Sequence, residues 1–364
     1  MRFRLLATLT LILQTMSMAA TAAPLPRMHP DSVWYQRVDS ATLHPASASI
    51  ISTWAGIGGG FGNNRMQIDF SFHVVNASPT APTGAIIAIP SADPEDAYYA
   101  TDCEALGSTV PMPIGGAIEG ESGYTCPNLG GDCHLLVVQG PQIFEVYRAN
   151  LAAGGLEAQC LARWRTDVLY PATGRGEHCT SADAAGFPIA PLLFNADEVA
   201  AAIQIPDSDI GHAIRFIVPN ARMARDDSLG GVSGRLYVRP ASHAGGPNGP
   251  VGSIPYGARL RLRADFPLTN YSPAAQVILR TLKRYGMVLA DGGTVALTAE
   301  SDLFTTSTWA SLGFTAQTFY LTPSATKVLA SDFEMIDTGP RIAETYDCVR
   351  SEPALNNLFA NGFE

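Results

Sequence analysis

Glycine and proline interrupt this chain at short intervals. It contains 34 glycines and 26 prolines, together 60 of its 364 residues. Proline removes a backbone hydrogen-bond donor and glycine weakens the interior of helices and strands, so this pattern favours short strands and turns over long helices. Apolar residues make up 46% of the chain, which is enough for a buried core and excludes a largely disordered protein.

Short segments of alternating or β-branched residues predict the strands. Residues 66–75 alternate apolar and polar side chains, which is typical of a half-buried strand. Residues 135–138 and 143–147 flank Gln139-Gly-Pro-Gln142 and predict a hairpin. Further strands are expected at residues 85–89, 213–218, 235–238 and 258–264.

Three short helices are predicted, over residues 47–54, over 196–203 behind an Asn195/Glu198 capping box, and from Ser272-Pro273 to about Tyr285. Many strands with few helices predict a mainly β fold: an antiparallel β-sandwich, of which the jelly roll is one form, with the helices at an edge or on one face. We expect one β-rich domain over 24–303 and a C-terminal extension and tail over 304–364.

The N-terminus predicts export. Residues 1–23 read as a signal peptide, with Arg2 and Arg4 before the apolar stretch 5–13 and small residues at 19–23. We therefore expect a secreted or periplasmic bacterial protein without a membrane span in the mature chain. Without these two arginines the chain carries 21 basic and 33 acidic residues, and this net charge of −12 argues against nucleic acid and anionic membranes as partners.

Six cysteines in an exported chain predict three disulfides, with 15 possible pairings. Cys160 with Cys179 is the preferred pair, and Cys348 must reach back from the C-terminal region if all six are paired. No CxxC or CxxxH spacing occurs, so a cysteine-based zinc site is disfavoured, and no metal or cofactor is expected. The chain also lacks GxSxG, HExxH, P-loop and EF-hand motifs.

The hairpin places three groups capable of acid–base chemistry together. With Gly140-Pro141 as its loop, His134, Glu145 and Tyr147 share one face, because side chains alternate along each strand. An imidazole, a carboxylate and a phenol there could supply a general acid, a general base and a hydrogen-bond donor. The alternative is a solvated polar end of a sheet.

Two further residues and one arginine row are candidates. Asp183, in the polar loop 180–186, could be catalytic, a metal ligand or a turn-forming residue. His212 begins a strand, where a structural role is the commoner alternative. Arg259, Arg261 and Arg263 line one strand face and could hold an anionic ligand such as a uronate or sulfate, or could be a solvent face paired with carboxylates.

A series of motifs carries a family resemblance: residues 113–120 (PIGGAIEG), 132–138 (DCHLLVV), 144–147 (FEVY), 180–189 (TSADAAGFPI), 212–216 (HAIRF) and 276–291 (QVILRTLKRYGMVLAD). In this order, over about residues 45–303, they resemble an uncharacterised family of exported bacterial proteins. The resemblance implies one family-wide domain and supplies no activity.

The chain also departs from that family. Cys133 stands where the family has arginine, and Cys179 stands in a segment where tryptophan is expected, which suggests an added disulfide framework. The ending LFANGFE, residues 358–364, resembles a tail of exported gammaproteobacterial proteins, for which sorting or processing and a frayed terminus are the two interpretations.

Together these features favour an exported glycan-acting protein, a hydrolase or lyase, with an extracellular polysaccharide as partner. His134 and Glu145 would be its acid–base pair, supported by Tyr147, Asp183 and His212. One alternative is a non-catalytic glycan- or envelope-binding β-sandwich, in which Trp54, Trp164 and Trp309 would matter most. The other is a structural secreted protein without a soluble ligand.

Overall fold

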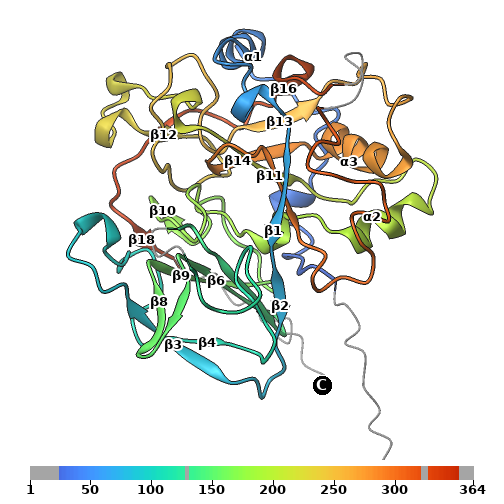
Figure 1. The fold of residues 1–364 in the computed structure, drawn as a ribbon. Helices are drawn as coiled ribbons and strands as arrows, with labels where there is room; N and C mark the ends of the chain where they lie inside the picture. The colour runs from blue at the N-terminus through green and yellow to red at the C-terminus, as the bar shows by residue number, and fades with distance from the viewer. Residues whose placement is uncertain (1–23, 128–130, 321–326, 352–364) are drawn as a thin grey trace, which may run out of the picture.

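The computed structural model describes residues 24–127, 131–320 and 327–351 (Figure 1). The predicted signal peptide and the tail at 358–364 lie outside these residues. The described chain is mainly strands, arranged in several sheets with few helices, as the sequence predicts. None of the helices in the described part of the chain is both long and apolar enough to cross a membrane.

A mixed six-stranded sheet forms the upper half of the molecule in Figure 1. Its central strands β11 and β14 are parallel, with Phe216 opposite Leu289. Helix α1 contacts its edge strand β16, α3 contacts β13, and α2 packs against α3. In sheet order the strands are β1 (Ile68–Phe72), β15 (Leu297–Glu300), β11 (Ile214–Val218), β14 (Met287–Gly292), β13 (Arg259–Leu262) and β16 (Phe333–Met335).

Two four-stranded sheets form the lower half of the view and enclose a second apolar cluster. The first has the order β2 (Val74–Asn76), β5 (Leu135–Gln139), β6 (Gln142–Tyr147) and β9 (Cys160–Arg165). The second has the order β4 (Thr109–Pro111), β3 (Thr83–Ala88), β8 (Gly155–Ala158) and β7 (Asn150–Ala152). Two-stranded sheets pair β10 (Gly176–Glu177) with β18 (Val349–Arg350), and β12 (Leu236–Tyr237) with β17 (Ile342–Ala343).

The predicted hairpin and the helix caps are confirmed. In β5 and β6, Leu136 lies opposite Glu145, the predicted register. Helices α1 (Ser47–Gly56), α2 (Ala196–Ile203) and α3 (Pro273–Arg284) fall where they are expected. The capping box of α2 is complete, and the hydroxyl of Ser272 accepts a hydrogen bond from the α3 backbone. These features depend on local hydrogen bonds, which is why the sequence predicts them well.

Two expectations about the strands need correction. The single strand predicted over 66–75 is divided at His73, because β1 and β2 belong to different sheets. The sheets are also not purely antiparallel, since β1–β15, β11–β14, β2–β5 and β3–β8 are parallel pairs. Parallel neighbours need long crossover connections, and an alternating pattern within one segment does not reveal which sheet it joins.

All six cysteines form three disulfides, but the preferred pair Cys160–Cys179 is wrong. Cys160 pairs with Cys103, Cys126 with Cys133, and Cys179 with Cys348. The last bond brings β18 beside β10, and the segment after residue 303 also supplies β16 and β17. This part of the predicted C-terminal extension is therefore built into the sheets.

Candidate active site

A cavity of about 750 Å³ opens at the carboxyl ends of β11 and β14. Asn220 follows β11, and Asp291 lies at the end of β14. In sheets with parallel strands this edge is the usual place for ligand binding, because loops diverge there and leave a crevice. Other parts of the chain complete the walls, with side chains that include Tyr99, Asp102, Tyr147, Arg235, His243 and Tyr346.

Asp291 is the carboxyl group best placed for proton transfer. Its Oδ1 accepts a hydrogen bond from Gly292 N at 2.6 Å, and its Oδ2 accepts one from Ala184 N at 3.2 Å. Burial, with the nearby charge of Asp183, raises its pKa from 3.8 to about 7 against the opposing charge of Arg215. Asp291 is therefore close to half protonated at neutral pH and can donate a proton there.

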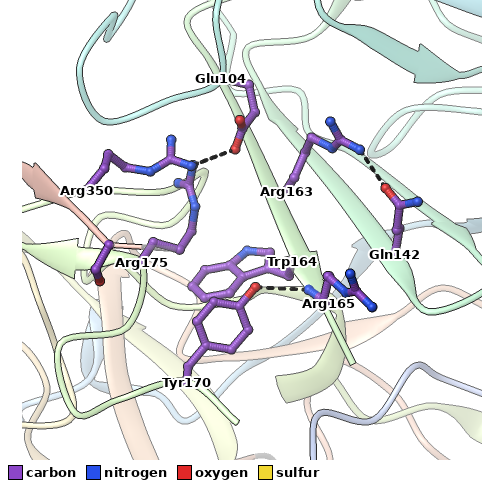
Figure 2. A pocket seen from close by; sticks show the side chains of 9 residues that line it. Glu104, Gln142, Arg163, Trp164, Arg165, Tyr170, Arg175 and Arg350 are labelled. Carbon is purple, nitrogen blue, oxygen red and sulfur yellow. Dashed lines mark hydrogen bonds and ion pairs between the residues drawn. The ribbon is translucent and has the colours of Figure 1, made fainter. Parts of the chain in front are cut away.

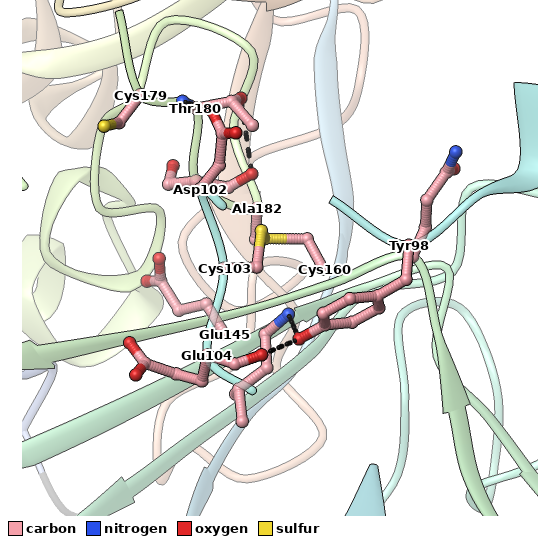
Figure 3. Close-up of a disulfide and its surroundings, with 12 residues drawn as sticks. Tyr98, Asp102, Cys103, Glu104, Glu145, Cys160, Cys179, Thr180 and Ala182 are labelled. Atoms are coloured by element: carbon pink, nitrogen blue, oxygen red, sulfur yellow. Dashed lines mark hydrogen bonds between the residues drawn. A yellow bond between two sulfur atoms is a disulfide. The ribbon is translucent and has the colours of Figure 1, made fainter. Parts of the chain in front are cut away.

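Asp102 provides a second carboxyl group in the cavity wall. Its Oδ2 accepts a hydrogen bond from Thr180 N at 2.8 Å, a contact visible in Figure 3. Burial raises the pKa of Asp102, whereas this hydrogen bond and the charges of Arg175 and Arg350 act to lower it. Besides the exposed Glu95, the cavity thus contains Asp291 and Asp102 in different environments, an arrangement that separates an acid role from a base role.

Aromatic side chains line the same cavity. The rings of His243 and Tyr346 stack with centroids 5.1 Å apart. His243 Nδ1 donates to the carbonyl of Ala184 at 2.7 Å, and burial lowers the pKa of this histidine to about 4, so the imidazole is neutral. Burial raises the pKa of Tyr147, which keeps its hydroxyl group protonated. These groups offer flat apolar surface beside hydrogen-bonding atoms.

Next to this cavity, His134 forms a buried ion pair. Its Nδ1 is 2.7 Å from Glu119 Oε2, and its Nε2 is 3.1 Å from the carbonyl oxygen of Ala182. Both partners are acceptors, so both ring nitrogens carry hydrogen. Burial disfavours this charge, but the Glu119 carboxylate outweighs it and raises the pKa of His134 to about 10. His134 is therefore a fixed cation rather than a group that exchanges protons near neutral pH.

Asp183 is the second charged residue beneath the cavity. It is fully buried, and its Oδ2 accepts a hydrogen bond from Arg215 Nε at 3.2 Å. Arg215 is itself held by Thr298 through a 3.0 Å hydrogen bond. Burial raises the pKa of Asp183. The structure thus brings His134, Tyr147 and Asp183 to the cavity or to the layer against it.

Glu145, unlike Tyr147, does not reach the cavity. It is fully buried, and its Oε1 accepts hydrogen bonds from Ile189 N at 2.8 Å and Ala190 N at 2.9 Å. Its Oε2 accepts a further bond from the indole of Trp164 at 3.0 Å. These hydrogen bonds connect β6 to the turn at 189–192. Neither His134 nor Glu145 is among the residues that line the cavity. The predicted common hollow for this pair is therefore not found.

His212 also lies away from the cavity. It precedes β11, whereas Asp291 lies at the end of the parallel strand β14, so the two occupy opposite edges of the sheet. His212 is fully buried, its Nδ1 donates to the carbonyl of Ala213 at 2.7 Å, and burial keeps its pKa well below the usual value. These contacts fit the structural alternative for this residue.

Two arginines of the row and the three tryptophans make contacts inside the fold, whereas Arg263 pairs with Asp265 at the surface. Arg259 is buried and donates to the carbonyls of Val33, Gln36 and Tyr285. Arg261 likewise fastens the N-terminal segment, so these two arginines do not face an anionic ligand. The side chains proposed for a binding surface are buried as well, with exposed fractions of 0% for Trp54, 2% for Trp164 and 5% for Trp309.

The described residues contain one cluster with the spacing of metal ligands, Asp102 with Cys179 and Cys348. Its two sulfurs form a disulfide, so they do not act as thiolate ligands. The sequence patterns described above do not point to Asp291, Asp102 or His243. A signal existed for Asp291, because it is a carboxylate that directly follows the apolar strand residues Met287–Ala290.

Comparison of the chain with protein-family models, with curated proteins and with solved structures finds no match.

Proposed function

We propose that this protein is an exported glycan-acting enzyme, a hydrolase or a lyase, whose reaction takes place in the cavity of about 750 Å³. One observation carries the proposal: Asp291, with a pKa of about 7, shares this cavity with a second carboxyl group, Asp102. Export is supported by the predicted signal peptide and by three disulfides, which are typical of oxidising compartments.

In the proposed reaction Asp291 is the general acid and Asp102 the general base. The acid protonates the glycosidic oxygen as the bond to carbon breaks. In hydrolysis, the base takes a proton from the attacking water, whereas in a lyase it removes a proton from the sugar carbon. Asp183 is a positioning residue, because its charge helps to hold the proton on Asp291.

The aromatic lining supports a sugar substrate. The stacked rings of His243 and Tyr346 can pack against the apolar face of a pyranose, and Tyr147 can donate a hydrogen bond to a sugar oxygen. The buried tryptophans give no comparable support to the non-catalytic binding alternative.

The test is turnover by the mature chain on a panel of extracellular polysaccharides. New reducing ends report cleavage of the polysaccharide by either reaction, and the ultraviolet absorbance of unsaturated uronates among the products distinguishes a lyase from a hydrolase. Asp291→Asn and Asp102→Asn should each lower turnover by about a hundredfold or more, the contribution of a general acid or base. Asp265→Asn, which changes an exposed carboxylate outside the cavity, is the matched control. Equal turnover in all three variants would remove the proposed site.

A further inference from the structure

A second, separate pocket has the opposite charge. It has a volume of about 350 Å³ and is lined by Glu104, Gln142, Arg163, Trp164, Arg165, Tyr170, Arg175, Arg350 and Ser351 (Figure 2). Four arginines and one glutamate therefore line a small cavity in a chain with a net charge of −10. Arg165 is also paired with Asp167, so Arg163, Arg175 and Arg350 are the arginines that line the pocket together with Glu104.

Arg175 is the centre of this arrangement. Its side chain is 3% exposed, and its guanidinium lies over the ring of Trp164 with 5.7 Å to the centroid. Nη1 donates to the carbonyl of Thr180, and Nη2 donates to Glu104 Oε1 at 3.0 Å. The buried Nε has no acceptor among the described residues. A buried N–H without an acceptor is costly, and a ligand oxygen would satisfy it.

The charge of Arg175 is also incompletely balanced. The same oxygen of Glu104 that it binds accepts a hydrogen bond from Arg350 at 3.0 Å. One carboxylate thus serves two guanidinium groups. Arg163 also lines the pocket, and its guanidinium donates to a neutral acceptor there, the amide oxygen of Gln142, at 2.6 Å. Guanidinium groups gathered in this way match the oxygens of carboxylate, sulfate and phosphate.

We propose that this pocket binds an oxyanion carried by a molecule of about monosaccharide size. In this proposal the Nε of Arg175 donates to the anion, and the rings of Trp164 and Tyr170, whose centroids are 5.1 Å apart, line the remaining space. The volume exceeds that of a bare anion and lies at the small end of ligand pockets. This site does not depend on the proposed reaction, because Asp291 is not among its residues.

Calorimetric titration of the mature protein tests the proposal. The probes are inorganic sulfate, inorganic phosphate, glucuronate and a sugar sulfate, with glucose as the neutral comparison. Saturable binding of at least one oxyanion, without binding of glucose, is expected. Tighter binding of the sugar-borne anions would identify an acidic sugar as the ligand, whereas equal binding of the inorganic ions would identify the free anion.

Variants locate the binding. Arg163→Gln and Arg175→Gln should each lower the affinity for the oxyanion by about tenfold or more, which corresponds to the loss of one charge-assisted hydrogen bond. Arg263→Gln removes the same charge from an exposed ion pair outside the pocket and should leave affinity unchanged.

Arg163 is exposed, so its variant remains informative if Arg175→Gln fails to fold. Absence of saturable binding, or equal weakening in all three variants, would overturn the proposal. Asp291→Asn should bind the oxyanion normally, which separates this result from failure of the proposed reaction.

Discussion

The protonation state of Asp291 can be tested without a substrate. Its pKa in the folded protein is about 7 against 3.8 for an unperturbed aspartate. Between these values the folded state holds a proton that the unfolded state has released, so stability falls as the pH rises. Asp291→Asn removes this titration. The variant should therefore gain stability relative to the wild-type protein as the pH rises.

The size of this gain follows from the two pKa values. One pKa unit corresponds to about 1.4 kcal/mol, and integration from about pH 5 to pH 8 gives about 3 kcal/mol. The partial exposure of Asp291 reduces the expected value to about 2 kcal/mol. Glu145, Glu300 and Glu344, whose pKa values burial also raises to about 7, titrate in both proteins and cancel in the comparison.

Guanidinium unfolding at the two pH values provides the measurement. The difference in unfolding free energy, Asp291→Asn minus wild type, should be larger at about pH 8 than at about pH 5 by about 2 kcal/mol. The fixed cost of replacing an oxygen with an amide nitrogen is the same at both pH values and drops out. Asp265→Asn, at an exposed position, should not show this gain. A difference independent of pH would refute a proton on Asp291 and, with it, the acid role.

Other predictions concern the disulfides and the buried ion pair. Replacement of Cys179 and Cys348 by alanine opens a loop of 169 residues, whereas the same change at Cys126 and Cys133 opens one of 7. Loop-closure entropy predicts that the first double variant loses about 3 kcal/mol more stability than the second in denaturant unfolding; equal losses would contradict this account. Glu119→Gln removes the carboxylate that holds the proton on the buried His134, and should cost about 3–5 kcal/mol at neutral pH. Unfolding measured from about pH 6 to pH 9 checks this, because the folded wild-type protein keeps a proton on His134 that the unfolded chain releases. Wild-type stability therefore falls as the pH rises, and the cost of the variant should shrink.

The sequence predicted local features of the fold better than distant pairings. The hairpin register and the capping box at Asn195 depend on residues a few positions apart, and both are confirmed. The division of one predicted strand at His73 depends on partners from two sheets, which alternation alone does not encode. The disulfide partner of Cys179 lies 169 residues away and follows from the packing of β18 against β10.

The candidate site shows the same difference. Alternation along the hairpin correctly set His134 opposite Tyr147, whose rings lie 5.4 Å apart. It could not show that the distant turn at 189–190 would bind one oxygen of Glu145 while the indole of Trp164 binds the other. Asp291 lies far from this hairpin in the sequence, and only the tertiary fold brings its strand end to the same cavity.

The segment 102–104, drawn beside the Cys103–Cys160 disulfide in Figure 3, supplies one carboxyl group to each candidate site. Asp102 faces the acidic cavity, Glu104 faces the arginine pocket, and Cys103 between them is bonded to β9 through Cys160. The charges of the pocket arginines help to lower the pKa of Asp102. An oxyanion bound in the pocket would offset those charges and raise that pKa. By linkage, loss of the proton from Asp102 would then weaken oxyanion binding, and the two proposed sites would be coupled through electrostatics without any movement of either site.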